Sequence, residues 1–205
     1  MSEYQYYEFQ AVDRPLTRRE MEELRARSSR ASITPSRFVN HYEWGDFKGD
    51  PQKWMEKYFD AHLYLANWGS RHLALRFPRA ALPIETAKAY CRGDSASVSA
   101  KGDHVILNFS SQDEEGDWDS DGRDEMASLL PVRAEIAAGD YRALYLGWLL
   151  AVQADEIAEG DREPSCPGGL RDLTGPQEAF VRFLRVDRDI LAVASERSPE
   201  AEFAQ

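Results

Sequence analysis

A continuous apolar stretch, YRALYLGWLLAV at 141–152, constrains the fold of this chain more than any other segment. It follows a Gly139–Asp140 step, in which the glycine can end one helix and the Asp140 carboxylate can cap the next. Beyond that cap the residues are apolar all round a helix, whereas a surface helix shows a polar face. Gly147, in the middle, leaves room for another backbone to approach closely. The sequence therefore predicts a buried central helix around which a helical C-terminal half packs.

The composition is that of a folded protein that needs no disulfide. Of its 205 residues, 42% are hydrophobic and 30% are charged, and a chain of this length buries about 70% of its unfolded surface. Cys91 and Cys166 lie far apart without metal-type spacing, which indicates a reducing cytoplasm. The N-terminal residues contain neither a basic region nor a long apolar run, so we expect no signal peptide. The longest apolar run is about ten residues, where a membrane span needs ~20.

The charge is negative overall and unevenly distributed. A net charge of −11 disfavours nucleic acid as a partner, because phosphate contacts need Lys and Arg. Residues 113–125 hold eight Asp and Glu against one Arg, whereas residues 14–37 hold seven Arg against three Glu. Such asymmetry guides a partner in some proteins, but two solvated faces are the simpler interpretation.

Local signals predict four elements in the first 60 residues. The aromatic, polar-interleaved segment 4–12 is typical of a strand. Thr17 opens a helix with a Thr-Arg-Arg-Glu capping box. Alternation over 38–44 predicts a second strand. Asp50 followed by Pro51 predicts a helix start, because the carboxylate caps and the proline fits the first turn.

A hairpin is predicted over 62–77, with its turn near Asn67–Ser70. If the leucines of both strands share one face, the loop must have an odd number of residues, and three residues satisfy this. His62 and His72 then lie together on the other, more polar face. A short helix near 83–90 and a second hairpin over 98–109 follow.

The order of elements predicts an α+β fold. Residues 1–111 form a sheet-rich part, whose sheet is covered on one face by helices, and residues 112–123 form an acidic linker or loop. Residues 124–198 form a helical part, in which the central helix runs to about Ala158, and 199–205 form a loose tail. One compact domain overall is the alternative.

The acidic stretch contains half of a calcium-binding motif. Asp117, Asp119 and Asp121 supply oxygen ligands at positions one, three and five of such a loop, and Gly122 stands at position six. Position twelve is Ser128, where a bidentate Glu belongs, and no predicted helix leads into the loop. We therefore favour a solvated linker over a specific cation site.

The histidines offer a second candidate metal site. All four fall on or beside predicted strands, and His62 and His72 meet on the hairpin. No H-x-H or H-E-x-x-H spacing supports a metal, so half-buried structural histidines are the simpler interpretation. The many strand aromatics, such as Tyr7, Tyr42 and Trp44, predict core packing, or a binding platform if they line one open sheet face.

Three strings give a resemblance to known sequences: YQYYEFQAVDRPLT, YFDAHLYLANWG and GDYRALYLGWL. In these strings the chain resembles a family of uncharacterised bacterial proteins, and the resemblance covers most of its length. Family members often continue beyond the last helix near Asp187, so this chain would be a short version. The resemblance implies a bacterial, cytoplasmic, stand-alone protein and transfers no activity, cofactor or catalytic residue.

The leading functional hypothesis is a non-catalytic interaction protein without a cofactor, because the titratable residues form no recognisable nucleophile, base or phosphate-binding motif. Its partner would be another protein, and the chain itself a monomer, with a homodimer as the alternative. The rival is a metal-dependent hydrolase that uses carboxylates near 113–125 or the His62/His72 pair. A deep pocket that brings together two or more of His62, His72 and Asp117 would favour the hydrolase.

Overall fold

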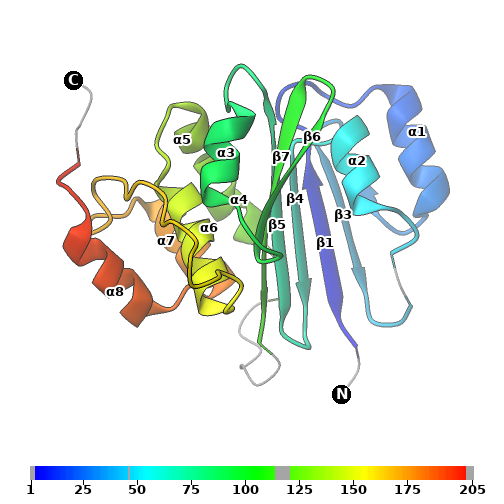
Figure 1. The fold of residues 1–205 in the computed structure, drawn as a ribbon. Coiled ribbons are helices and arrows are strands. Elements are labelled where there is room, and N and C mark those ends of the chain that lie inside the picture. The colour runs from blue at the N-terminus through cyan, green and yellow to red at the C-terminus, as the bar shows by residue number, and fades with distance from the viewer. Residues whose placement is uncertain (1–2, 46, 114–120, 202–205) are drawn as a thin grey trace.

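The aromatic N-terminal strand lies inside a seven-stranded antiparallel sheet (Figure 1). The structure, a computed structural model, describes residues 3–45, 47–113 and 121–201. The strand order is β2-β3-β1-β4-β5-β7-β6. In chain order the strands are β1 (Gln5–Gln10), β2 (Ser32–Ile33), β3 (Arg37–Tyr42), β4 (Ala61–Ala66), β5 (Ser70–Pro78), β6 (Ala96–Lys101) and β7 (His104–Gln112).

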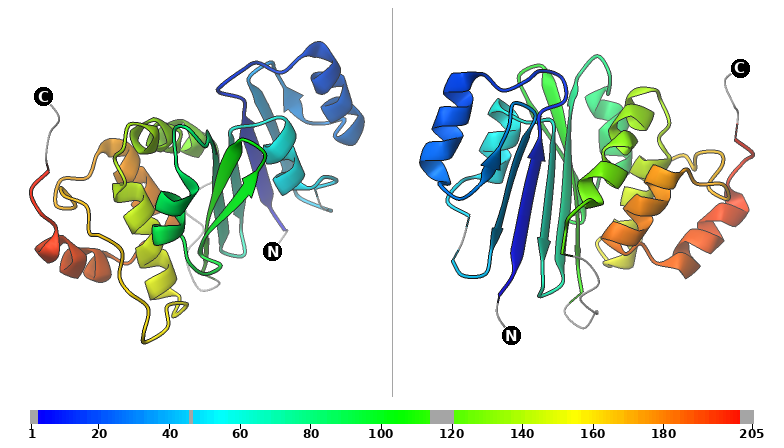
Figure 2. Two further views of the ribbon diagram at one scale, coloured as in Figure 1. Left: turned by 45° about the horizontal axis from the view of Figure 1, so that its top comes forward. Right: turned by 180° about the vertical axis from the view of Figure 1, so that it is seen from behind.

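Helices cover both faces of this sheet, which corrects the prediction of one covered face (Figures 1 and 2). One face carries α1 (Arg18–Arg27) and α2 (Pro51–Lys57). The C-terminal helices pack on the other: α3 (Ile84–Tyr90), α4 (Glu125–Leu129), α5 (Pro131–Ala137), α6 (Arg142–Gln153), α7 (Gly175–Leu184) and α8 (Arg188–Arg197). Each face has its own apolar core. The fold is therefore α+β with a sheet-rich first half and a helical second half.

The helix starts follow the predicted caps. Thr17 and Glu20 form a complete capping box on α1, and the Asp50 side chain accepts the N–H of Lys53 at the start of α2. Gly139 adopts a positive φ of 92° directly after α5, as a glycine that ends a helix does. Asp140 accepts the N–H of Arg142 at 3.1 Å, although the N-cap position itself falls on the next residue.

The hairpin of β4 and β5 has the predicted three-residue loop. Leu63 pairs with Leu73, and both belong to the core beneath the C-terminal helices. His62 and His72 lie on the opposite face. The prediction that an odd-numbered loop places the leucines on one face and the two histidines on the other is therefore confirmed.

Helix α6 is the buried central helix that its apolar pattern predicts. Nine of its twelve residues are buried, which leaves no polar face toward solvent. The helix ends at Gln153, earlier than the predicted Ala158. A methyl group at Gly147 would overlap the ring of Phe109 on β7 and lie 3.6 Å from the Ala96 side chain. The close neighbour is thus a side chain of the sheet and not a second helix backbone.

A buried ion pair between Asp60 and Arg76 connects several segments of the chain. Asp60 is fully buried and pairs with Arg76 at 2.6 Å, while it also accepts the N–H groups of Val12 and Asp13. Burial alone would raise the pKa of Asp60, but these hydrogen bonds outweigh it and hold the pKa below its ordinary value. Arg133 on α5 then donates to the backbone oxygen of Arg76 and to the Asp13 carboxylate, both at 2.7 Å.

Two remaining predictions concern the chain ends and the membrane. The backbone oxygen of Pro199 accepts the N–H of Gly169, so the segment directly after α8 packs on the preceding loop. Residues 202–205 and most of the acidic stretch lie outside the described residues. Among the helices that the structure describes, none has the length and apolar character to cross a membrane.

Candidate functional site

The predicted histidine pair does form, with His62 buried and His72 partly buried. The rings of His62 and His72 lie 5.3 Å apart, and His62 stacks on Phe9 with ring centroids 4.1 Å apart. His62 is 2% exposed, and neither of its ring nitrogens has a hydrogen-bond partner among the described residues. Burial lowers the pKa of His62 well below its ordinary value and that of His72 to about 4. Both imidazoles are therefore neutral at pH 7.

A metal centre needs at least a third ligand beside these two rings. Within the described ranges, no group of three or more His, Cys, Asp or Glu side chains could hold a metal ion. Asp117 and Asp119 lie outside those ranges. The Asp121 carboxylate pairs with Arg123 at 3.2 Å and accepts the backbone N–H of that residue. The described part of the chain thus supplies no support for the cation loop, and the loop itself stays a prediction.

The cysteines lack the properties of a nucleophile. Burial raises the pKa of the Cys91 thiol to about 12, and burial also raises the pKa of Cys166. The thiolate is the reactive form, so neither residue is activated at neutral pH.

The strand aromatics divide between the two faces instead of lining one platform. Tyr6 is buried on the face of the C-terminal helices. Tyr7 and Tyr64 lie on the opposite face, where the Tyr7 ring packs 4.7 Å from Tyr64 and 4.7 Å from Phe47. Trp44 remains 79% exposed just after β3. Most of the set is therefore packing, as the simpler interpretation predicted, and Trp44 needs another explanation.

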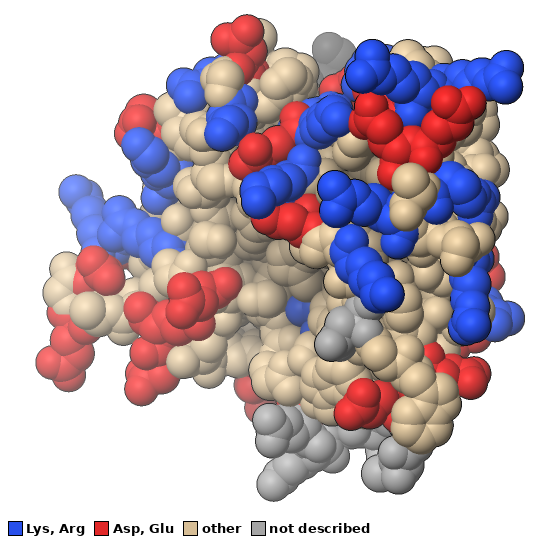
Figure 3. All heavy atoms as spheres, turned by 90° about the vertical axis from the view of Figure 1, so that its right-hand side faces the viewer, with Lys and Arg blue, Asp and Glu red and all other residues tan. Residues whose placement is uncertain are grey.

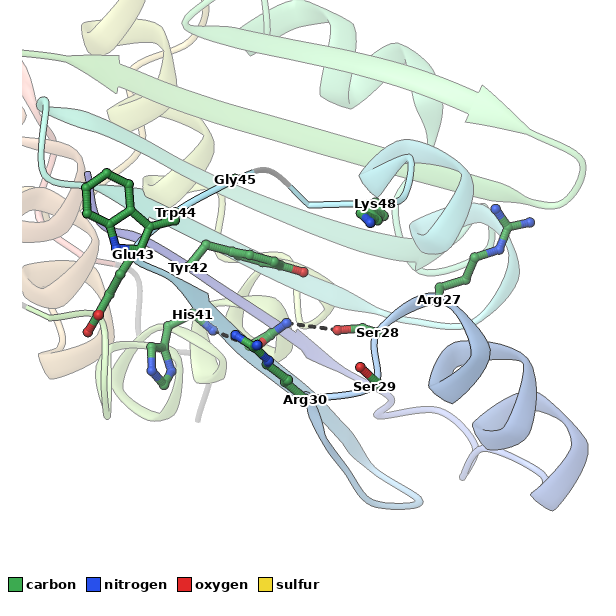
Figure 4. Close-up of a pocket in the computed structure, with 11 residues that line it drawn as sticks. Arg27, Ser28, Ser29, Arg30, His41, Tyr42, Glu43, Trp44, Gly45 and Lys48 are labelled. Carbon is green, nitrogen blue, oxygen red and sulfur yellow. Dashed lines mark hydrogen bonds between the residues drawn. The ribbon is translucent and has the colours of Figure 1, made fainter. Parts of the chain in front are cut away.

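Trp44 stands beside a hollow of about 590 Å³ at one edge of the sheet (Figure 4). The short strand β2 pairs only with Phe38 and Val39, so the rest of the β3 edge is not covered by a neighbouring strand. The end of α1 and the link to β2 run past this uncovered edge and enclose the hollow. Its lining residues are Arg27, Ser28, Ser29, Arg30, Asn40, His41, Tyr42, Glu43, Trp44, Gly45 and Lys48.

Hydrogen bonds fix the floor of this hollow. The Asn40 side chain donates to the Ser28 hydroxyl at 2.8 Å and accepts the N–H of His41 at 3.0 Å. Asn40 and Ser28 are both buried, so the end of α1 is held against β3. The Tyr42 ring packs edge-on against Tyr7 at 5.8 Å. The polar and aromatic walls therefore rest on the fixed sheet.

The hollow is positively charged although the chain is acidic. Among the described residues that line it, Arg27, Arg30 and Lys48 stand with a single carboxylate, Glu43. None of the three cations forms an ion pair within the described part of the chain. Figure 3 shows Lys and Arg side chains gathered on this side of the molecule.

A second hollow of about 770 Å³ shares Arg27 and Lys48 with the first and continues between α1 and α2. Two of its three lysines are already neutralised, because Lys57 pairs with Glu23 at 2.8 Å and Lys53 pairs with Asp50 at 3.2 Å. Of the described cations that line the two hollows, those without an ion pair are Arg27 and Lys48, which both hollows share, and Arg30, which lines only the first. We call the first hollow the basic hollow.

Comparison of the chain with models of protein families, with curated proteins and with solved structures found no match. The site must therefore be interpreted from its own chemistry. The described lining of the basic hollow contains cations, hydroxyls, an amide and two aromatic rings. Such groups bind an anion, and in this lining no nucleophile is hydrogen-bonded to a base.

Sequence reasoning did not find the basic hollow. Its residues come from three separate segments, 27–30, 40–45 and Lys48, which only the fold brings together. Two signals were present, namely the arginine excess over 14–37 and a tryptophan at the end of a predicted strand. Neither signal states which of the arginines lack a carboxylate partner.

Proposed function

We propose that this protein is a non-catalytic binding protein that holds an anionic group of its partner in the basic hollow. The observation that carries the proposal is that Arg27, Arg30 and Lys48, which have no ion-pair partner among the described residues, surround a concave site. Elsewhere in the described chain many Arg and Lys side chains are neutralised, as Arg142 is by Asp140 at 2.7 Å. Unpaired cations in a hollow attract an anion and cost little desolvation because they remain exposed.

Binding explains this site better than catalysis does. Most of the described residues that line the hollow are exposed, so it does not exclude water in the way that strengthens catalytic electrostatics. The Ser28 hydroxyl accepts a hydrogen bond from the Asn40 amide and, among the described residues, donates to no base that could activate it. The His62/His72 pair lies in the aromatic core and does not line the hollow.

Calorimetric titration with pyrophosphate, a small anion without an aromatic part, tests the proposal. We expect binding that weakens as salt is added, because exposed charges are screened. Replacing Arg27, Arg30 and Lys48 with Ala should weaken it by at least about tenfold, since charge-assisted hydrogen bonds contribute roughly 1.5–3 kcal/mol each.

The matched control removes three equally exposed cations elsewhere, Arg18, Arg19 and Arg162. It lowers the net charge by the same amount and should leave the affinity nearly unchanged. Equal weakening in both variants would attribute binding to overall charge and refute the basic hollow. Absence of pyrophosphate binding to the wild-type chain would refute it as well.

We propose further that the chain is a cytoplasmic monomer. Both cysteines are free, which suits a reducing compartment. Residues 143–151 of α6 are buried within the same chain and, of its apolar residues, only Val152 near its end is exposed, so this helix supplies no large apolar patch for a second copy. Sedimentation that shows a single mass of 23.3 kDa over a range of concentrations would agree with this proposal, and a concentration-dependent dimer would contradict it.

A further inference from the structure

We propose that the ligand of the basic hollow is a nucleoside phosphate, whose base stacks on Trp44 and whose phosphates contact Arg27, Arg30 and Lys48. This inference rests on the proposed function and names its ligand class. The inference of a nucleoside phosphate depends on the positions of the aromatic and cationic groups within the hollow and not only on its positive charge.

The aromatic end of the hollow is exposed. The Trp44 side chain is 79% exposed and stacks on no ring among the described residues. Tryptophan is usually well buried because its indole has a large apolar surface, so an exposed one beside a hollow indicates a contact for a partner. A planar base offers a π-face to such an indole, and a base–aromatic stack contributes roughly 1–3 kcal/mol.

Two of the three cationic groups lie toward the other end, and Arg30 lies between the two ends, near His41 and Ser29 (Figure 4). Figure 4 shows Trp44 and Glu43 at one end of the hollow and Arg27 and Lys48 toward the opposite end, with Tyr42 between them. Glu43 would repel a phosphate at the Trp44 end, but its carboxylate can accept a hydrogen bond from a base amine or a ribose hydroxyl. The charge pattern therefore orients a ligand with its ring at Trp44 and its phosphates at the cations.

An extended peptide fits this edge less well. Arg37 exchanges backbone hydrogen bonds with Thr34 on the side of β3 that faces away from β1. Every second residue along β3 directs its N–H and C=O groups to this same side, and His41 is one of them. The N–H of His41 is already bonded to the Asn40 side chain at 3.0 Å. This donor is therefore not free to pair with an added strand. Recognition must come from side chains, which suits a compact ligand.

The size of the hollow agrees with such a ligand. Its volume of about 590 Å³ lies within the roughly 300–1,000 Å³ of small-molecule sites. A long polyanion would also meet the negative field of a chain whose net charge is −11. The volume of the hollow and the net charge of the chain thus favour a free nucleotide over a nucleic-acid strand that carries the same chemistry.

Calorimetry with ADP, pyrophosphate and adenosine tests this inference on the whole chain. We expect ADP to bind about tenfold more tightly than pyrophosphate, and adenosine to bind weakly, because only ADP engages both ends. Trp44→Ala should reduce the affinity for ADP to that for pyrophosphate and leave pyrophosphate binding unchanged. Trp68→Ala is the matched control, since Trp68 is another exposed tryptophan, in the loop between β4 and β5.

The outcomes separate this inference from the proposed function. Equal affinity for ADP and pyrophosphate, or no effect of Trp44→Ala on ADP, would overturn the nucleotide and leave the anion site standing. Failure of all three probes would overturn both. A single-stranded RNA hexamer that binds more tightly than ADP would assign the site to nucleic acid, and a hexaglutamate peptide that does so would assign it to an acidic protein segment. Either result would overturn the free nucleotide.

Discussion

Gly147→Ala should destabilise this protein, although alanine is the better helix former. The position lies in the middle of α6, where a Cβ atom would overlap the ring of Phe109. Phe109 is fully buried and packs edge-on against Phe180 with ring centroids 5.0 Å apart. The ring is therefore enclosed between the sheet and the helices, and it cannot move aside without displacing other core residues.

Two opposing terms set the size of the effect. Alanine gains about 1 kcal/mol over glycine inside a helix. Forcing an extra carbon into a well-packed core costs about 1–3 kcal/mol. The net decrease in the free energy of unfolding for Gly147→Ala is then about 0–2 kcal/mol. The cost of packing the extra carbon can be obtained by itself when the stability gained from replacing glycine by alanine in a helix is measured at another position.

Gly175→Ala provides that separate measurement. Gly175 is the first residue of α7, and a Cβ there would meet nothing within 4 Å. Urea unfolding of both variants should show Gly147→Ala to be less stable than Gly175→Ala by about 1–3 kcal/mol. In a Phe109→Leu background, which removes the obstructing ring, Gly147→Ala should lose most of its cost, with a coupling of about 1 kcal/mol.

Equal stability of the two alanine variants would refute the close contact between α6 and β7. A Gly147→Ala cost that persists unchanged in the Phe109→Leu background would also refute it, because the obstruction would then lie elsewhere.

Three further predictions concern the core. Leu146→Ala should cost about 2–5 kcal/mol in urea unfolding and leave a monomer, since Leu146 is fully buried; dissociation of a dimer without unfolding would contradict the buried helix. The pKa values of His62 and His72 are lowered in the fold. As the pH falls, the unfolded chain therefore binds protons before the folded chain does. The free energy of unfolding should be constant above about pH 6.5 and fall by a few kcal/mol toward pH 4. His72→Gln should flatten that decline, whereas His41→Gln, at an exposed position, should not. Asp60→Asn should cost about 3–5 kcal/mol, because it leaves a buried arginine without its counter-charge, and an unaffected melting temperature would contradict that role.

Short sequence patterns were enough to predict most helices and strands of this fold. The capping box at Thr17, the Asp50–Pro51 helix start and the odd-numbered hairpin loop each depend on residues a few positions apart. Such signals do not require knowledge of the rest of the chain. Pro131 begins α5, in agreement with the tolerance of proline in the first turn of a helix.

Those patterns alone did not predict that helices cover both faces of the sheet, although one strand carries a sequence pattern that indicates it. Strand β7 carries Val105, Ile106 and Leu107 in succession, and all three are fully buried. A continuous apolar run of this kind is typical of a strand enclosed on both sides, whereas alternation would mark one open face. The helix α1 that helps to cover the second face presents only a narrow apolar stripe around Leu24, which favoured a solvent-facing interpretation.

The basic hollow lay beyond sequence reasoning for a different reason. Whether an arginine is neutralised depends on which carboxylate the fold brings near it. Arg18 and Arg19 find partners one helical turn away, which the sequence shows, whereas Arg37 pairs with the distant Glu8. Arg27 and Arg30 lack such a partner within the described residues, which their positions in the sequence do not show.

The most direct test of the central claim is the location of the ligand on the molecule. Backbone amide shifts of the ¹⁵N-labelled chain, recorded while ADP is added, report which residues the ligand contacts. The account predicts that saturable shifts cluster at residues 27–30, 40–45 and 48 and are absent from the face that carries α3–α8. Shifts that cluster around α6, or that scatter over the surface without saturation, would contradict a binding site in the basic hollow.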